Sequence, residues 1–259
     1  MRRSGGLGLL LAALAFGHAR AGAWPEPAGQ TQAILKYEED DARDGFDRHG
    51  DRVPIAKVHD DDLILFVEHG LTSRLTFQFK GGYTSGEDQF VRFDGRAPIE
   101  FGLRYTFFQR PRTVLSVYVG GIVDGQGRNA GYAPPKQGTE DFEVRLLAGR
   151  SALVRRHEVF VDFEAARLVR GGLPDETRVD ATAGLYLTKT WLVLLQSYSG
   201  QADAQGTPPD RTAPNWVKVE LGLVRHFGPW SVQAGWRQTA YGHDVPVEGG
   251  PVIGLWRRF

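Results

Sequence analysis

The chain has 259 residues, no cysteine and a formal net charge of zero at pH 7. The lack of cysteine excludes a disulfide framework and a thiolate metal site, and the balanced charge excludes a strongly basic nucleic-acid surface. Charged residues make up 24% of the chain and the mean hydropathy is −0.32. These values suit a soluble protein, but they equally suit a membrane barrel, in which half of each strand faces water.

The start of the chain has the composition of a secretory signal peptide. Two arginines precede a short apolar run at 7–16. Both Ala19-Arg20-Ala21 and Ala21-Gly22-Ala23 satisfy the small-x-small rule, and we expect cleavage after the second motif. The alternative is an uncleaved anchor, but the run has only about half of the roughly 20 apolar residues that a spanning helix needs. We therefore expect a signal peptide at 1–23 and a single domain at 24–259.

After a short extended leader at Trp24–Gly29, apolar and polar residues alternate along many segments. Side chains alternate across a strand with period two, so each segment predicts a strand with two unlike faces. The expected strands are 30–38, 62–69, 74–83, 99–107, 113–119, 141–150, 158–166, 178–187, 191–198, 216–225, 230–239 and 251–259.

The hairpin at 99–119 has the most regular pattern. Five apolar side chains from Ile99 to Phe107 alternate with polar or small ones, and the pattern resumes after a short turn up to Val119. A strand so regularly two-faced is unusual in a soluble sandwich. It fits a strand with lipid on one side and a polar lumen on the other.

The connections between the expected strands alternate between long and short. We expect long loops at 39–57, 84–97, 124–138, 167–176, 199–214 and 240–250. No apolar run after the signal peptide is long enough for a spanning helix, so a membrane protein here must be a barrel. The sequence predicts a twelve-stranded antiparallel transmembrane β-barrel with short periplasmic turns, long extracellular loops and both termini in the periplasm.

The C-terminus and the aromatic residues agree with this prediction. Outer-membrane barrels resemble one another in ending on an aromatic residue that the assembly machinery reads, and Phe259 matches that signal. Arg257 departs from the pattern, because an apolar residue would be expected there. Trp191, Trp216 and Trp230 begin strands, and four other aromatic residues lie near strand ends: Tyr105, Phe107, Tyr198 and Phe259. We expect these residues in the aromatic girdle at the membrane–water boundary.

Two short runs resemble a known family. The run Trp24-Pro-x-Pro-x-Gly-x-x-Gln-x-Ile and the later Glu68-His69-Gly70-Leu71-Thr72 resemble the XagA-like family of outer-membrane proteins. The whole pattern also looks like porin-type families proposed to take up hydrophobic or aromatic compounds. The resemblance implies a pore or export role linked to exopolysaccharide production and biofilm formation. It gives no catalytic residues to carry over.

The inward-facing charged positions form the candidate site. The predicted lumen-lining residues are Glu68, Lys80, Glu100, Arg104, Glu143, Arg145, Asp162, Glu164, Asp180, Lys218, Glu220 and Arg237. Acids and bases on neighbouring inner faces should pair across strands. Three acid–base pairs also lie close on single strands: Glu100 and Arg104, Glu143 and Arg145, and Lys218 and Glu220. Two interpretations stay open: a charged lumen that passes polar solutes, or a lumen filled by its own salt bridges.

A lipid hydrolase at the outer rim is a hypothesis from a different class. His49, His59 and His243 fall in or beside extracellular loops, but no serine pairs obviously with them, and the chain has no Gly-x-Ser-x-Gly elbow and no zinc-ligand spacing. We therefore expect no enzyme activity, catalytic residue, metal ion or cofactor. The acidic runs 38–41 and 60–62 could bind the divalent cations that bridge lipopolysaccharide, although solvated loops are the simpler interpretation.

The most direct functional expectation is an outer-membrane pore that passes a polar solute or polymer. The alternative is a non-conducting barrel used for adhesion or envelope structure. The expected partners are outer-membrane lipid and lipopolysaccharide, the barrel assembly machinery and a polysaccharide. No nucleic acid is expected as a partner.

Overall fold

The computed structural model describes residues 22–126, 140–206 and 212–259. Most of the expected signal peptide therefore lies outside the described residues, as do parts of the expected loops at 124–138 and 199–214. The described residues contain no helix that is long and apolar enough to cross a bilayer.

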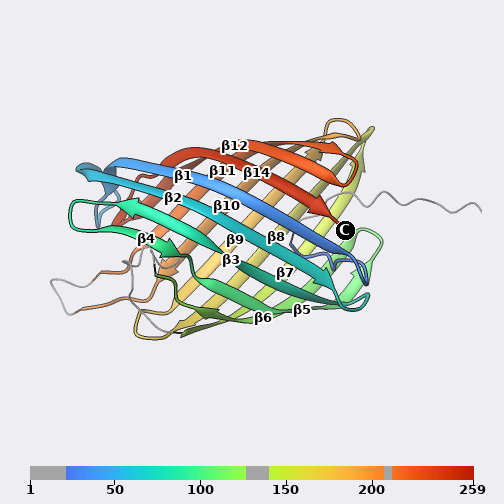
Figure 1. Ribbon diagram of the computed structural model, residues 1–259, viewed down its shortest axis with the longest axis horizontal. Coiled ribbons are helices and arrows are strands. Elements are labelled where there is room, and N and C mark those ends of the chain that lie inside the picture. Colours follow the sequence, from blue (N-terminus) through green and yellow to red (C-terminus); the bar gives the residue numbers. More distant parts are fainter. Residues whose placement is uncertain (1–21, 127–139, 207–211) are drawn as a thin grey trace, which may run out of the picture.

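Twelve long strands form one antiparallel barrel, as predicted (Figure 1). They are β1 (Thr31–Phe46), β2 (Arg52–Gly70), β3 (Leu75–Glu87), β5 (Ile99–Arg110), β6 (Thr113–Val123), β7 (Glu140–Val154), β8 (His157–Arg170), β9 (Glu176–Tyr186), β10 (Trp191–Ala202), β11 (Asn215–Phe227), β12 (Trp230–His243) and β14 (Gly249–Arg258). Two short strands, β4 (Arg92–Arg96) and β13 (Val245–Pro246), pair with the outer parts of β3 and β1.

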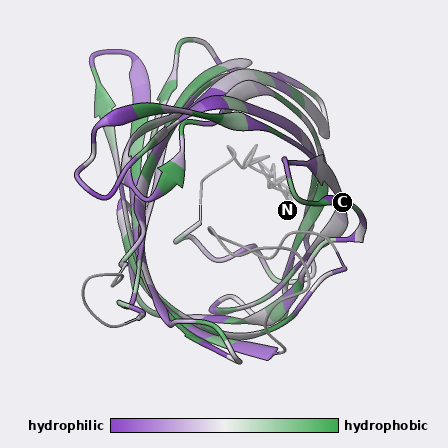
Figure 2. Cartoon of the chain, turned by 90° about the vertical axis from the view of Figure 1, so that its left-hand side faces the viewer, coloured by the Kyte–Doolittle hydropathy of each residue, from purple (hydrophilic) through white to green (hydrophobic). Residues whose placement is uncertain are grey.

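The barrel closes because β1 pairs with both β2 and β14. Leu35 lies opposite Leu65 on one side and opposite Leu255 on the other. A closed sheet has no free edge, so every strand can satisfy its backbone hydrogen bonds within lipid. The view along the barrel axis shows the resulting ring (Figure 2).

Both ends of the described chain lie at the same end of the barrel. The amide of Phe259 donates to the carbonyl of Thr31 at 2.9 Å. The short turns lie at this end too, and the β1–β2 hairpin projects from the opposite end (Figure 1). We assign the end with the termini to the periplasm, following the arrangement usual in such barrels.

Several predicted loops are strands in the structure. The prediction of a loop at 39–57 is wrong, because β1 runs to Phe46 and β2 starts at Arg52. The pairing is irregular at a register shift between Ala42 and Asp44 and at the turn between the strands. In the turn the Asp47 carboxylate accepts hydrogen bonds from the amides of His49 and Asp51 at 2.7 and 3.0 Å. Both faces of these outer strand parts are exposed to water. The strands therefore continue without the alternation of apolar and polar residues from which a strand can be predicted.

The outer surface of the barrel carries an apolar belt. Leu103, Leu146, Val161 and Leu221 are 44–59% exposed on the outward faces of their strands. A monomeric soluble protein rarely exposes so large a continuous apolar surface, and a bilayer covers it naturally.

The periplasmic rim of this belt explains the unexpected Arg257. Its guanidinium lies 4.6 Å from the centre of the Trp230 ring and 4.4 Å from that of Phe259. Arg225 covers Trp191 in the same way at 4.8 Å. Cations over aromatic rings at the membrane boundary keep their charge near water while the rings meet lipid.

Two predicted girdle residues are placed differently. Tyr198 lines the lumen, so its assignment to the girdle is wrong. Trp216 is buried and also lines the lumen, so its assignment is wrong as well. Its ring fills the space beside Gly200 on β10, where a side chain would collide with it. The predicted strand start at 216 is correct to within one residue, but the side chain of Trp216 points inward.

Candidate functional site: the barrel lumen

The lumen holds a cavity of about 630 Å³. Ten of the twelve predicted lumen-lining residues lie on its wall; the exceptions are Arg104 and Glu220. Both of these side chains also point inward but are fully buried. Arg104 lies against the start of the described chain, and Glu220 binds Lys36 at 2.8 Å and Gln233 at 2.9 Å.

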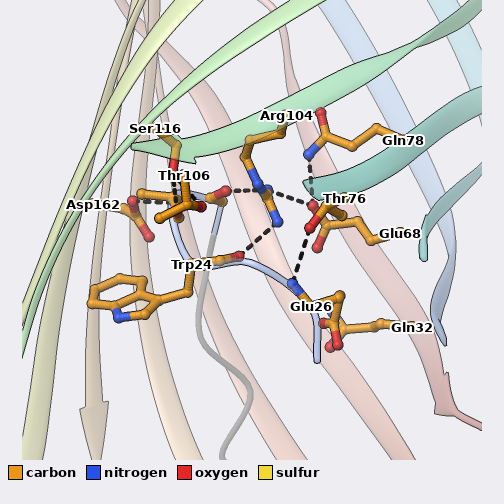
Figure 3. A network of polar contacts seen from close by, with 12 residues as sticks. Trp24, Glu26, Gln32, Glu68, Thr76, Gln78, Arg104, Thr106, Ser116 and Asp162 are labelled. Carbon is orange, nitrogen blue, oxygen red and sulfur yellow. Dashed lines mark hydrogen bonds and ion pairs between the residues drawn. The ribbon is translucent and has the colours of Figure 1, made fainter. Parts of the chain in front are cut away.

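Residues 22–30, here called the N-terminal segment, fold into the lumen from the periplasmic end. Arg104 on β5 donates to the carbonyl oxygens of Gly22 and Trp24, the latter at 2.6 Å (Figure 3). The Glu26 amide donates to Oγ1 of Thr76 on β3 at 3.1 Å. The expected leader is therefore part of the lumen, which sequence reasoning did not foresee.

Arg104 is the centre of this attachment. Its guanidinium also forms a buried ion pair with Glu68 on β2 at 2.6 Å, and Gln78 on β3 donates to the same Glu68 oxygen at 2.6 Å (Figure 3). Arg104 has no exposed surface. A buried arginine is costly unless its charge and its donors have partners. The carboxylate and the two carbonyls supply partners for both terminal nitrogens of Arg104, while its buried Nε has none among the described residues.

Trp24 seals the same region with apolar contacts. Its ring meets Phe160 edge-on, with centroids 6.4 Å apart and an interplanar angle of 82°. Val114 and Leu147 belong to the same buried cluster. At Gly149 the Trp24 ring would lie 2.6 Å from an added Cβ, so the indole needs a glycine at this point of the wall. The part of the periplasmic half of the lumen around Trp24 is therefore packed like a protein core.

Substituting Gly149→Ala should lower the free energy of unfolding by about 1–3 kcal/mol, because the added methyl overlaps the Trp24 ring. Urea unfolding in detergent measures this change. Gly121→Ala is the matched control, since the nearest atom to its new Cβ lies 3.9 Å away. Equal stability of the two variants would contradict the packing of Trp24 against this wall.

Further out, seven charged side chains form the outer lumen cluster: Lys36, Glu38, Asp40, Lys218, Glu220, Arg237 and Glu248. Lys36 Nζ lies 2.6 Å from Glu38 Oε1, and Arg237 binds Glu38 at 2.5 Å and Asp40 at 2.6 Å. Each cation contacts at least two carboxylates. This arrangement fixes the long side chains against the wall and leaves mixed charge facing the cavity.

A second group, the central lumen cluster, surrounds Arg145 on β7. Its guanidinium binds Glu143, Glu100 at 3.2 Å and Glu164 at 3.1 Å. It also covers the Tyr118 ring, 4.8 Å from the centroid. Three carboxylates around one arginine leave an excess of negative charge on this side of the lumen.

Two of the three expected same-strand pairs have other partners. Glu143 and Arg145 do pair, but Glu100 binds Arg145 and not Arg104. Lys218 binds Glu248 and Asp40, whereas Glu220 binds Lys36. These partners lie on strands that are not adjacent, because Glu100 on β5 reaches Arg145 on β7 and Glu220 on β11 reaches Lys36 on β1. The long side chains therefore pair across the curved inner face of the closed barrel.

Sequence reasoning missed several wall residues. The missed charged residues are Lys36, Glu38, Asp40, Asp60, Asp62, Arg178 and Glu248. The alternation that begins at Gln32 predicts that Lys36, Glu38 and Asp40 point inward. Asp40 lies beyond the predicted strand end at residue 38, so it was assigned to a loop. Apolar residues line the lumen too: Ile34, Ile64, Phe66, Leu192 and Leu194.

The described residues contain one group that could hold a metal ion: Glu39, Asp41 and His59. It lies on the outward face of β1 and β2 beyond the lipid belt. The His59 ring contacts Asp41 at 3.0 Å and Asp61 at 3.1 Å. Partial burial opposes protonation, but these two carboxylates raise the pKa of His59 above its ordinary value of 6.5. The acidic run 38–41 is thus divided between lumen and outer surface.

The sequence pattern also did not indicate a contact between His226 and Ser231. His226 Nδ1 lies 2.7 Å from Ser231 Oγ at the periplasmic end of β11 and β12. The ring stacks on Tyr186 with centroids 5.9 Å apart and meets Trp256 edge-on. Neither His226 nor Ser231 lines the cavity. The pair therefore contributes to packing at the closed end of the lumen, far from the outer rim where a lipid hydrolase was considered.

No protein-family model and no curated protein matches the sequence. Solved structures do resemble it in fold. An outer membrane channel from Pseudomonas putida F1 is 12% identical over 94% of this chain and 100% of its own, with a TM-score of 0.71. The NanC porin is 8% identical over 86% and 98%, with a TM-score of 0.52. The translocator domain of the autotransporter NalP from Neisseria meningitidis is 12% identical over 90% and 89%, with a TM-score of 0.51.

The protein is an outer-membrane β-barrel. The closed antiparallel barrel, its apolar belt and its likeness to outer-membrane structures agree on this point. At these identities the likeness defines the fold alone. These structures do not bear on the resemblance to the XagA-like family, which stays a prediction.

Proposed function

We propose that this protein is an outer-membrane channel for a small solute, with its periplasmic end closed by the N-terminal segment until that segment moves. The observation that carries the proposal is the cavity of about 630 Å³ inside a closed barrel. Its volume lies in the range of roughly 300–1,000 Å³ that suits small ligands. A polymer such as an exopolysaccharide is less well supported, because Arg104 and Trp24 hold the N-terminal segment across the lumen.

The lining favours a solute with both a charged and an apolar part. Ile34, Ile64 and Phe66 place an apolar surface on the β1–β2 side of the cavity, while the outer and central lumen clusters supply charge of both signs. Charged walls orient polar groups, and apolar walls bind the remainder of such a molecule without a desolvation cost. The proposal assigns no catalytic reaction, metal ion or cofactor to the chain.

Single-channel recording in planar bilayers tests the channel directly. We expect small, defined conductance steps from the purified barrel and larger ones when the N-terminal segment is released. Complete absence of current at every voltage, for the intact chain and for variants that release the segment, would favour the adhesion or envelope barrel instead.

Ion selectivity should respond to the charge at Lys80, which lines the cavity opposite Glu100 on the neighbouring strand. Lys80→Glu should raise the permeability of cations relative to anions several-fold, because it replaces a lumen cation by a carboxylate. Reversal potentials in a salt gradient measure this ratio. Lys189→Glu in an exposed periplasmic turn is the charge-matched control. An identical shift in both variants would contradict a conducting path beside Lys80.

A further inference from the structure

The two residues before the tryptophan of the N-terminal segment are built into the lumen wall. Arg104 donates to the Gly22 carbonyl, and Ser116 Oγ donates to the Ala23 carbonyl at 2.8 Å (Figure 3). The Ala23 amide donates to Asp162 Oδ1 at 3.0 Å, and Ala23 has no exposed surface. Cleavage after Ala23 would leave three buried wall groups each short of one partner, which costs free energy.

A second observation concerns negative charge beside Gly22. Asp162 Oδ2 is buried and accepts no hydrogen bond from the described residues. A Glu164 carboxylate oxygen occupies the side of Gly22 where a Cβ would stand. Asp162 and Glu164 thus direct two carboxylates of β8 toward the start of the N-terminal segment. Buried carboxylates are costly without a compensating positive group. Glu164 already has Arg145 at 3.1 Å, whereas Asp162 forms no ion pair with a cation in the described part of the chain.

We propose that a signal peptidase hydrolyses the Ala21–Gly22 bond, and that the new ammonium group of Gly22 binds Asp162 and Glu164 inside the lumen. Water adds across the peptide bond, so Ala21 leaves as a carboxylate and the Gly22 nitrogen gains a proton and becomes positively charged at neutral pH. Ala19-Arg20-Ala21 satisfies the cleavage rule as well as the later motif does. The rule cannot rank the two motifs, but the wall contacts favour the earlier one.

This processing gives the N-terminal segment its anchor. Before cleavage the Gly22 nitrogen is a neutral amide, and after cleavage it is a cation that can pair with Asp162 and Glu164. An ion pair in a low-dielectric lumen is stronger than one in water. The closure of the lumen would then be completed only after secretion, whatever solute the barrel passes.

The intact mass of the protein purified from outer membranes gives the first test. We expect the mass of residues 22–259, and the mass of residues 24–259 would overturn the proposal. The second test labels amines of the folded protein in detergent with an N-hydroxysuccinimide ester near neutral pH. The Gly22 amine should react at least about tenfold more slowly than in urea-unfolded protein. Lys189, exposed in a turn, is the internal control and should react at similar rates in both states.

The double variant Asp162→Asn, Glu164→Gln keeps the shape of both side chains and removes their charge. The Gly22 amine should then lose most of its protection while the intact mass still shows a chain that starts at Gly22. Heat-modifiable gel migration checks that the variant is folded. Full protection in a folded variant, or an unprotected Gly22 amine in the wild type, would overturn the ion pair. If the variant does not fold, the wild-type labelling decides the matter alone.

Discussion

Substituting Arg104→Met should lower the free energy of unfolding by about 3–5 kcal/mol, because it leaves the buried Glu68 carboxylate without its cation. The same change removes the donors to the Gly22 and Trp24 carbonyls, so it should also release the N-terminal segment and increase conductance several-fold. Urea unfolding in detergent measures the first effect and bilayer recording the second. Arg156→Met, in an exposed turn, is the control and should change neither.

A further variant separates the two effects. Adding Glu68→Gln to Arg104→Met removes the uncompensated buried charge, so it should recover much of the lost stability. The N-terminal segment would still lack its arginine, and conductance should stay high. If conductance returns to the wild-type level together with stability, Arg104 does not hold the segment across the lumen.

A substitution at Leu103, the residue before Arg104, tests which face of the strand meets lipid. Leu103→Arg places a charge in the middle of the apolar belt, where Leu103 is 44% exposed, and should cost about 2–4 kcal/mol. Val154→Arg adds the same charge at the periplasmic end, where the cost should fall to about 0–1 kcal/mol. Folding yield, heat-modifiable gel migration and urea unfolding report the difference. If Leu103→Arg folds as well as Val154→Arg, the assignment of inside and outside faces is wrong.

Leu103 and Arg104 also mark what the sequence can and cannot predict. The alternation of side chains is a local property, so the pattern from Ile99 to Phe107 correctly predicts which of the two meets lipid. It cannot predict the partners of Arg104, because these come from β2 and from the start of the chain. Glu100 lies four residues from Arg104 on the same strand, but the partner of Arg104 is Glu68 on β2.

The loops and the leader show two other limits. Beyond the membrane the strands β1 and β2 are wet on both faces, so the charged run from 39 to 57 resembles a loop although most of it is strand. The leader at 24–29 resembles a short exposed tail because its proline-rich sequence has no period. Its burial depends on the space left by Gly149, on a hydroxyl acceptor from β3 and on donors from β5 and β6, which only the closed barrel brings together.

A reversible lock on the N-terminal segment tests the central claim most directly. The chain has no cysteine, so Glu26→Cys with Thr76→Cys introduces a single possible disulfide where the Glu26 amide and Thr76 Oγ1 lie 3.1 Å apart. The oxidised barrel should conduct little in a planar bilayer, and reductant added to the same membrane should raise the conductance to the wild-type level or above. Equal conductance before and after reduction of a verified disulfide would contradict closure of the lumen by the N-terminal segment.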